Sequence, residues 1–237
     1  GEPTGIPFET DPAFAVKGGA RMAVPWALEL NPCGAFAAEA WVKPASLSAN
    51  STDYRTAFSS EGNGPTGWLV YQQPNNTWAW VIYGDNWVSS FIADELDTVA
   101  ANTWYHMVLV SEGNNIYKFY VNGRLTATRE WSLYVPNRDG KVNLGWRSLN
   151  DFKPFDGTID DVAFYNKALT LEQVQAHYAA SVRLSCDRAG DKLILSWPSG
   201  TLQQSDRVDG DYTDVQNAVS PMTNSFSGNT KFFRVKM

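Results

Sequence analysis

The 237-residue chain has little of what marks several large classes of protein. It holds two cysteines, two histidines and only 19% charged residues, and it has no apolar stretch long enough to cross a membrane. Two cysteines are too few for a cysteine-based zinc site. The formal net charge of −6 disfavours nucleic acid, because that partner requires lysine and arginine side chains to neutralise phosphates. The composition therefore predicts neither membrane insertion nor nucleic-acid binding.

Familiar catalytic and phosphate-binding motifs are missing as well. The sequence contains no His-Glu-x-x-His, no Gly-x-Ser-x-Gly and no glycine-rich phosphate loop. His106 lies in an apolar run and is predicted to pack within a sheet. His177 is predicted to lie on the surface near the end of a helix. This pattern favours a protein that is not an enzyme.

Short apolar runs separated by glycine, proline and asparagine make up most of the chain. Aromatic residues reach 14%, and aromatic side chains favour strands. The predicted strands are Phe14–Val16, Ala37–Val42, Arg55–Phe58, Trp68–Tyr71, Trp78–Tyr83, Val88–Ile92, Tyr105–Val110, Tyr117–Val121, Val142–Leu144 and Ile159–Tyr165. One helix is predicted over Leu171–Ala179, because Thr170 and Gln173 have the spacing of a capping box. The pattern predicts an all-β fold with one short helix.

Five motifs follow one another between residues 10 and 180. They are Trp41-Val42-Lys43-Pro44, Trp104 and His106 before an apolar run, Tyr120-Val121-Asn122-Gly123, Val142–Gly145, and Gly157–Leu169 with Asp160 and Asp161. The Asn122-Gly123 pair predicts a hairpin turn, since both residues tolerate a positive φ. In this order the motifs resemble those of laminin-G-like, concanavalin A-like jelly-roll domains. The resemblance implies a two-sheet antiparallel jelly-roll sandwich whose last strand returns beside the first.

The chain is predicted to divide into a jelly roll over residues 1–181 and a small β unit over residues 182–237 that packs on it. Residues 182–237 resemble a small β appendage at the C-terminus of secreted bacterial proteins, with a strand over Leu193–Trp197 and a closing strand over Lys231–Val235. We therefore expect a secreted, extracellular bacterial protein in which this chain is attached to other domains. In that setting Cys33 and Cys186 are expected to form a disulfide, and two buried free thiols are the alternative.

Aromatic residues gather between residues 66 and 91 and in two later loops. In the strand Trp78–Tyr83 the alternation places both tryptophans in the core and Tyr83 on the exposed, concave face. Sugar rings stack on aromatic faces, and their hydroxyls require polar side chains nearby. The candidate ligand-binding residues are Tyr71, Tyr83, Asp85, Trp87, Trp131, Trp146 and Arg147. The alternative for Trp131 and Trp146 is that they only cover the edges of the sandwich.

The resemblance also raises the questions of hydrolysis and calcium. Some relatives are glycosidases with a Glu-x-Asp-x-x-Glu pattern; here Glu95 and Asp97 are followed by Ala100 in place of the last acid, so the pair is incomplete. Other relatives hold a structural Ca²⁺ near the closing strand, and Asp160 matches a ligand position there. Glu9 or Asp11 could complete that calcium site.

These observations predict a non-catalytic carbohydrate-binding module that binds a polysaccharide or oligosaccharide by aromatic stacking and polar contacts. A protein–protein or cell-surface adhesion module is the first alternative, because the same jelly roll also serves such receptors. A glycoside hydrolase or lyase with an unrecognised site is the second.

Overall fold

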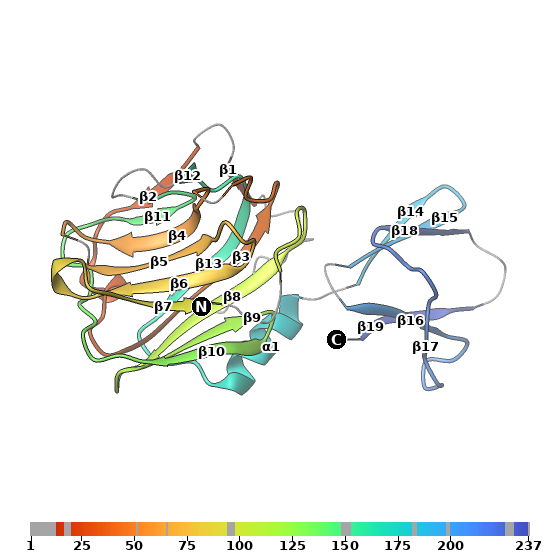
Figure 1. The fold of residues 1–237 in the computed structure, drawn as a ribbon. Coiled ribbons are helices and arrows are strands. Elements are labelled where there is room, and N and C mark those ends of the chain that lie inside the picture. The colour runs from red at the N-terminus through yellow and green to blue at the C-terminus, as the bar shows by residue number, and fades with distance from the viewer. Residues whose placement is uncertain are drawn as a thin grey trace.

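The chain forms a β sandwich followed by a smaller β unit (Figure 1). In this computed structural model, residues 13–16, 20–50, 52–64, 66–93, 98–147, 153–181, 184–197, 200–225 and 230–236 are described. The predicted all-β class is confirmed, with two main antiparallel sheets and one α-helix among the described residues.

The first layer of the sandwich is a six-stranded sheet. Its strands, in spatial order, are β1 (Phe14–Val16), β13 (Gly157–Tyr165), β3 (Ala35–Pro44), β8 (Tyr105–Glu112), β9 (Ile116–Val121) and β10 (Arg124–Glu130). The pairing of β1 with β13 returns the closing strand beside the first strand, as predicted. A bulge interrupts the pairing of β13 with β3 between Asp160 and Ala163, and Asp161 has a φ of 48° there.

The second layer is a seven-stranded sheet. Its order is β2 (Met22–Val24), β11 (Val142–Leu144), β4 (Arg55–Glu61), β5 (Gly67–Gln72), β6 (Trp78–Tyr83) and β7 (Ser89–Ala93), and β12 (Lys153–Pro154) pairs with β4 in parallel. Two 3₁₀ turns, η1 (Leu28–Leu30) and η2 (Asp85–Trp87), lie in the connections.

Alternating side chains fill the space between the two sheets. On β6, Trp78, Trp80 and Ile82 belong to the main core, whereas Val81 and Tyr83 lie on the opposite, outward face. The predicted facing of this strand is therefore confirmed. Each indole buries a large apolar area, which stabilises the sandwich.

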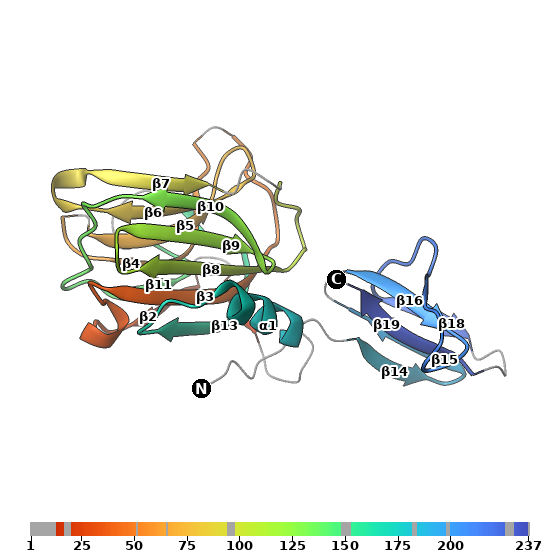
Figure 2. The same cartoon turned by 90° about the horizontal axis from the view of Figure 1, so that it is seen from below.

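The helix α1 (Leu171–Ser181) covers the outward face of the six-stranded sheet (Figure 2). The predicted capping box is present: the Thr170 N–H donates to Gln173 Oε1 at 3.0 Å, and the Gln173 N–H donates to Thr170 Oγ1 at 3.3 Å. Val174 and Leu169 pack on the sheet against Val108. The helix is thus fixed along the sheet by an apolar contact near its start. No helix in the described part of the chain is long and apolar enough to span a membrane.

The second unit consists of two three-stranded sheets. One has the order β14 (Ser185–Ala189), β15 (Lys192–Ser196) and β18 (Met222–Ser225), and the other has the order β17 (Thr213–Asp214), β16 (Thr201–Ser205) and β19 (Phe232–Lys236). Its own apolar cluster is built around Leu195, Trp197 and Leu202. The packing of this unit on the sandwich stays a prediction.

The expected disulfide is wrong, since Cys33 and Cys186 are both free and exposed. Cys33 precedes β3 at one end of the sandwich. The last turn of α1, after which the second unit begins, lies near the other end of β3, where Tyr178 stacks on Trp41. A strand advances about 3.3 Å per residue, so the ten residues of β3 keep the two thiols far beyond disulfide distance.

Candidate functional site

The outward face of the seven-stranded sheet carries three of the predicted ligand-binding residues. Tyr71 and Tyr83 lie there as predicted, beside Leu69, Ala79 and Val81. Their predicted exposure is wrong, however, because Tyr71 is only 6% exposed and Tyr83 only 8%. Neither ring therefore presents an open surface on which a sugar could stack.

The face is closed because the chain returns over it after β11. Ser59 Oγ donates to the Trp146 carbonyl at 3.2 Å, and the next residue, Arg147, donates from Nε to both Glu61 oxygens at 3.0 Å. Arg147 Nη2 also donates to the Tyr83 hydroxyl at 3.0 Å. Farther along, β12 pairs with the start of β4. The predicted open concave surface is thus occupied by the protein's own chain.

The buried Glu61–Arg147 pair serves the fold of this face. Burial raises the pKa of Glu61 to about 7, and the neighbouring Arg147 guanidinium only partly opposes that rise. Burial likewise raises the pKa of Tyr83 to about 12. Because Arg147 is held by Glu61 and Tyr83 together, its donors are directed at protein groups rather than at solvent.

Among the side chains that the structure describes, the other predicted residues lie outside this cluster. Asp85 is exposed in η2, and Trp131 is half-buried against the main core, which matches its alternative role of covering an edge of the sandwich. Trp146 is half-buried beneath the Arg21 guanidinium, 4.2 Å from its ring centroid. The side chain of Trp87 lies outside the described residues. Ligand contact by these residues stays a prediction.

The calcium and hydrolase predictions rest largely on residues outside the described set. Asp160 Oδ1 accepts a hydrogen bond from the Asp161 N–H at 3.0 Å, and Glu9 and Asp11 are not described. No cluster of three or more candidate metal ligands occurs among the described residues. One carboxylate supplies far fewer oxygens than Ca²⁺ requires, so the calcium site stays a prediction. Glu95 and Asp97 also lie outside the described residues.

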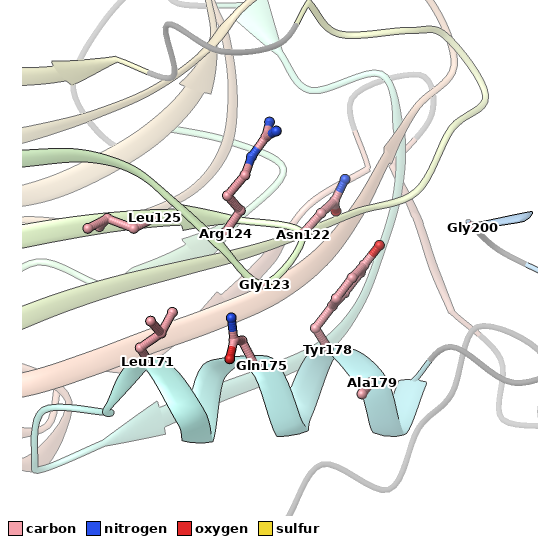
Figure 3. Close-up of a pocket in the computed structure, with 9 residues that line it drawn as sticks. All are labelled: Asn122, Gly123, Arg124, Leu125, Leu171, Gln175, Tyr178, Ala179 and Gly200. Carbon is pink, nitrogen blue, oxygen red and sulfur yellow. The ribbon is translucent and has the colours of Figure 1, made fainter. Parts of the chain in front are cut away.

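A groove of about 760 Å³ lies between the β9–β10 turn and α1, and we call it the hairpin–helix groove (Figure 3). Its lining residues are Asn122, Gly123, Arg124, Leu125, Leu171, Gln175, Tyr178, Ala179 and, from the second unit, Gly200. Its volume is in the usual range for small-ligand sites. Unlike the closed tyrosine face, this groove is open to solvent along exposed side chains.

Local sequence explains why these side chains meet. Asn122 and Gly123 have φ values of 52° and 73°, as the predicted hairpin turn requires, and the turn projects toward the helix. Leu171, Gln175 and Tyr178 are spaced i, i+4 and i+7, which places them on one helix face. The sequence analysis did not predict this groove. The spacing of Leu171, Gln175 and Tyr178 could have indicated that these three side chains line one side of a site.

The Tyr178 ring is held in the groove wall by ring contacts with the sheet. It stacks on Trp41 with ring centroids 5.7 Å apart and an interplanar angle of 21°, and on His106 at 6.0 Å and 13°. A Cβ added at Gly123 would lie 2.9 Å from Tyr178 Cδ1, so the turn is in close contact with the ring. Leu125 and Leu171, at 40% and 41% exposure, add apolar surface beside it.

One histidine prediction is confirmed and the other is wrong. His106 is buried in β8 as predicted. His177 is not a surface residue: its Nδ1 lies 3.0 Å from Glu39 Oε2, beneath the helix. The wrong prediction arose because the helical pattern alone does not show which residues of the last turns meet a polar group on the sheet.

Comparison with protein families gives one match. The model of the concanavalin A-like lectin/glucanases superfamily matches residues 17–175, which is well over half of the chain. Comparison with curated protein sequences gives no match.

Comparison with solved structures gives binding domains of bacterial toxins. The receptor binding domain of botulinum neurotoxin D is 15% identical, with a TM-score of 0.56, and the match covers 83% of this chain and 59% of that one. The serotype D ligand binding domain in complex with N-acetylneuraminic acid is 14% identical, with a TM-score of 0.56 and coverage of 83% and 57%. The binding domain of Paraclostridial Mosquitocidal Protein 1 is 13% identical, with a TM-score of 0.58 and coverage of 90% and 57%.

These likenesses establish a shared fold. The chain spans 57–59% of the length of these three structures, so it corresponds to a part of each.

Proposed function

Because the chain belongs to the concanavalin A-like lectin/glucanases superfamily, we propose that it is a non-catalytic carbohydrate-binding module that holds a polysaccharide or oligosaccharide in the hairpin–helix groove. The observation that carries the proposal is the composition of this groove. It combines a rigid aromatic ring, Tyr178, with the polar side chains of Asn122, Arg124 and Gln175. Saccharides require this combination, because their rings offer C–H faces and their edges offer hydroxyls.

The strength of binding follows from the exposure of the groove. A single ring on a wet surface contributes only a few kcal/mol, so the dissociation constant for one site is on the order of micromolar to millimolar. A module of this kind gains its retention on a polymer from repeated ligand units and from the other domains of a secreted bacterial protein.

Arg124 gives the groove a preference for acidic sugars. It is the only charged residue among the described residues that line the groove. The chain as a whole has a net charge of −6, so attraction of a carboxylated sugar depends on this local guanidinium. A solved structure of the same fold contains N-acetylneuraminic acid, a sugar acid, which is in keeping with this proposal.

A binding role without hydrolysis is supported by the same lining. Glycoside hydrolysis requires two carboxyl groups on either side of the scissile bond. None of the described residues that line the groove is acidic. The groove thus provides contacts for a saccharide but no acid–base pair.

The residues that the sequence first suggested are secondary candidates for contact with a saccharide. Asp85, Trp87, Trp131 and Trp146 are its members, and the buried Tyr71, Tyr83 and Arg147 support the sheet beneath. We assign them a lesser contribution, because the two rings among them that are described, Trp131 and Trp146, are half-buried. A structural Ca²⁺ at Asp160 belongs to the same proposal, and addition of a chelator tests it.

A protein–protein adhesion module is the second candidate, and one observation favours it. The edge strand β2 and the following turn carry exposed apolar side chains: Met22 at 43%, Val24 at 37%, Trp26 at 40% and Leu28 at 67%. Such a patch is typical of a protein contact. An adhesion module would bind no saccharide and would lose its partner when Trp26 is replaced.

The decisive experiment is a binding screen on soluble polygalacturonate, soluble dextran and insoluble cellulose, with and without chelator. We expect Tyr178→Ala to weaken binding roughly three- to tenfold, because it removes the aromatic wall. Arg124→Gln should weaken binding to polygalacturonate and reduce its salt dependence, while binding to dextran changes little.

Arg129→Gln is the matched control for the charge. It lies on the same strand as Arg124, is exposed, and donates to the Phe91 carbonyl away from the groove. A folded Tyr178→Ala and a folded Arg124→Gln that both retain full affinity would contradict the placement of the site. Absence of binding to all three polymers would contradict the proposed function.

A further inference from the structure

The hairpin–helix groove contains apolar side chains that the stacking of a sugar ring does not require. Leu125 and Leu171 both line it, and they are 40% and 41% exposed. A saccharide whose edges carry only hydroxyl groups gains little from leucine, because a hydroxyl that leaves water for an apolar surface loses hydrogen bonds. The two leucines therefore indicate a ligand that carries an apolar group besides its ring.

The two leucines come from different elements and face the same space. Leu125 pairs with Tyr120 across β9 and β10, and Tyr120 packs beneath α1, so Leu125 lies on the helix side of the sheet. Leu171 begins α1 and projects toward the β9–β10 hairpin (Figure 3). Both lie toward the end of the groove opposite Tyr178. We call this part, lined by Leu125 and Leu171, the leucine end of the groove.

Exposed leucines also occur elsewhere on the chain, outside the groove. Leu47 and Leu133 are 41% and 54% exposed, and neither lines the groove. Single exposed leucines are ordinary on a protein surface and require no ligand. Two leucines that meet in one concave site beside polar groups are instead typical of a ligand pocket.

Amide side chains lie between the leucine end and the ring of Tyr178. Gln175 is about one helical turn from both Leu171 and Tyr178, and its amide offers donors as well as an acceptor. Asn122 is oriented by the sheet, because its Oδ1 accepts a hydrogen bond from the His106 N–H at 2.9 Å. The groove thus places amide groups next to an apolar surface.

The groove is long enough to separate the stacking contact from the apolar contact. Leu171 and Tyr178 are seven residues apart in α1, which corresponds to about 10 Å along the helix axis. A sugar ring stacked on Tyr178 therefore leaves the leucine end free for a substituent of the same sugar unit or of the next one. Any saccharide has access to the first contact, whereas the second depends on the substituent.

We infer that the groove prefers N-acetylated saccharides, and that Leu125, Leu171 and Gln175 determine this specificity by binding the acetamido group. The acetyl methyl packs on the two leucines, where it leaves water without losing a hydrogen bond. The C=O and N–H of the acetamido group form hydrogen bonds with the side-chain amide of Gln175. This inference rests on the proposed function, since it names the class of saccharide that the same groove binds.

The test compares two soluble tetrasaccharides that differ only at the second carbon of each sugar unit. One is the β-1,4-linked tetramer of N-acetylglucosamine, and the other is the β-1,4-linked tetramer of glucose. We expect the full chain to bind the N-acetylated tetramer roughly tenfold more tightly, as the burial of a methyl group and an amide hydrogen bond together predict. Neither tetramer is charged, so the ratio of the two affinities should not change with salt.

Leu171→Gln and Leu125→Thr, made singly and together, test the leucine end. Both positions are exposed, and glutamine and threonine suit a helix and a strand, so we expect the fold to be kept. Each single variant should reduce the affinity ratio to about threefold, and the double variant should bring it close to one, because the methyl group then loses its apolar contact. Affinity for the glucose tetramer should stay unchanged.

Leu47→Gln is the matched control for the leucine variants. Leu47 is as exposed as Leu171 but lies outside the groove, so this variant should keep the wild-type ratio. Tyr178→Ala separates the ring from the leucine end, because it should weaken both tetramers by the same factor and leave their ratio unchanged.

Saturation-transfer NMR supplies a readout on the ligand itself. Irradiation of the protein methyl resonances should saturate the acetyl methyl protons of the N-acetylated tetramer most strongly in the wild type. The effect should be smaller in the variant that combines Leu171→Gln with Leu125→Thr. If that variant does not fold, the two single variants serve in its place.

The outcomes separate this inference from the proposed function. A wild-type ratio near one, or a ratio that the leucine variants leave unchanged, overturns the inference while saccharide binding stands. The same holds if the N-acetylated tetramer is not bound although polygalacturonate, dextran or cellulose is. If neither tetramer and none of these polymers binds, the proposed function itself fails.

Discussion

Glu39 and Glu61 are buried carboxylates on the outward faces of the two sheets, and each is held by basic side chains from another part of the chain. Glu61 is tied to Arg147, and Glu39 is tied to the two histidines. The two environments shift the pKa in opposite directions, because a fixed guanidinium does not offset complete burial at Glu61 whereas several donors do so at Glu39. The two outward faces of the sandwich thus differ in accessibility: one is closed by the chain, and the other carries an open groove.

A prediction at the residue scale concerns stability in acid. The folded-state pKa of Glu39 lies below its ordinary value of 4.5, so the folded state binds this proton less readily than the unfolded state does. The contribution of Glu39 to the free energy of unfolding is therefore fully present above about pH 5 and is lost as pH falls through the lowered pKa.

Thermal or urea unfolding between pH 3 and pH 7 checks this prediction. We expect Glu39→Gln to be less stable than the wild type by about 1–3 kcal/mol at pH 7, with the difference shrinking toward pH 3. A difference that stays constant over the whole range would show that the ionised carboxylate is not what stabilises the cluster.

The elements of the fold differ in how far their sequences reveal them. Strand β6 and strand β11 have the predicted bounds, since their side chains are packed tightly by both neighbouring strands. Strand β10 was missed because its largely polar sequence, Arg124–Glu130, shows no apolar alternation. Strand β2, Met22–Val24, was missed because three residues are too few to show a period.

The candidate site was harder to predict than the strands, for a topological reason. Asn122 and Tyr178 are far apart in sequence and meet only because α1 crosses the six-stranded sheet beside the β9–β10 turn. The covering of Tyr83 by Arg147 was not predicted for the same reason. The alternation on β6 placed Tyr83 on the correct face of the sheet, but it did not indicate that a distant segment of the chain covers that face. Local patterns indicate which face a residue takes, but not what lies over that face.

The contact between the β9–β10 turn and α1 gives the prediction at the scale of elements. Gly123 and Gly64 both have a positive φ, of 73° and 79°, so alanine strains the backbone at either position. Only at Gly123 does the added Cβ meet another side chain, 2.9 Å from Tyr178 Cδ1, whereas nothing lies within 4 Å at Gly64.

We expect Gly123→Ala to lower the free energy of unfolding by about 1 kcal/mol more than Gly64→Ala does, because the clash adds to the strain. Gly123→Ala should also weaken saccharide binding, and Gly64→Ala should leave it unchanged. Urea unfolding and the polysaccharide assay measure the two effects. Equal behaviour of the two variants would show that the turn does not set the position of Tyr178.

At the scale of the whole molecule, the two units have separate sheets and separate apolar clusters among the described residues. Both cysteines are free and exposed, one in each unit. We therefore expect two thiols per chain to react with a disulfide reagent in the native protein, and we expect a reductant to leave the melting temperature unchanged. Cys33→Ser and Cys186→Ser should each leave one reactive thiol, and a native protein with no reactive thiol would contradict the structure.

The placement of Cys33 and Cys186 has a practical consequence. Cys33 lies at the end of the sandwich remote from the last turn of α1, and Cys186 lies in β14 of the second unit. A donor and an acceptor fluorophore attached to these native sulfurs would lie in different units, so no cysteine has to be introduced by mutation. Energy transfer between the dyes would then report, one molecule at a time, whether the distance between the two units changes when a polysaccharide is added.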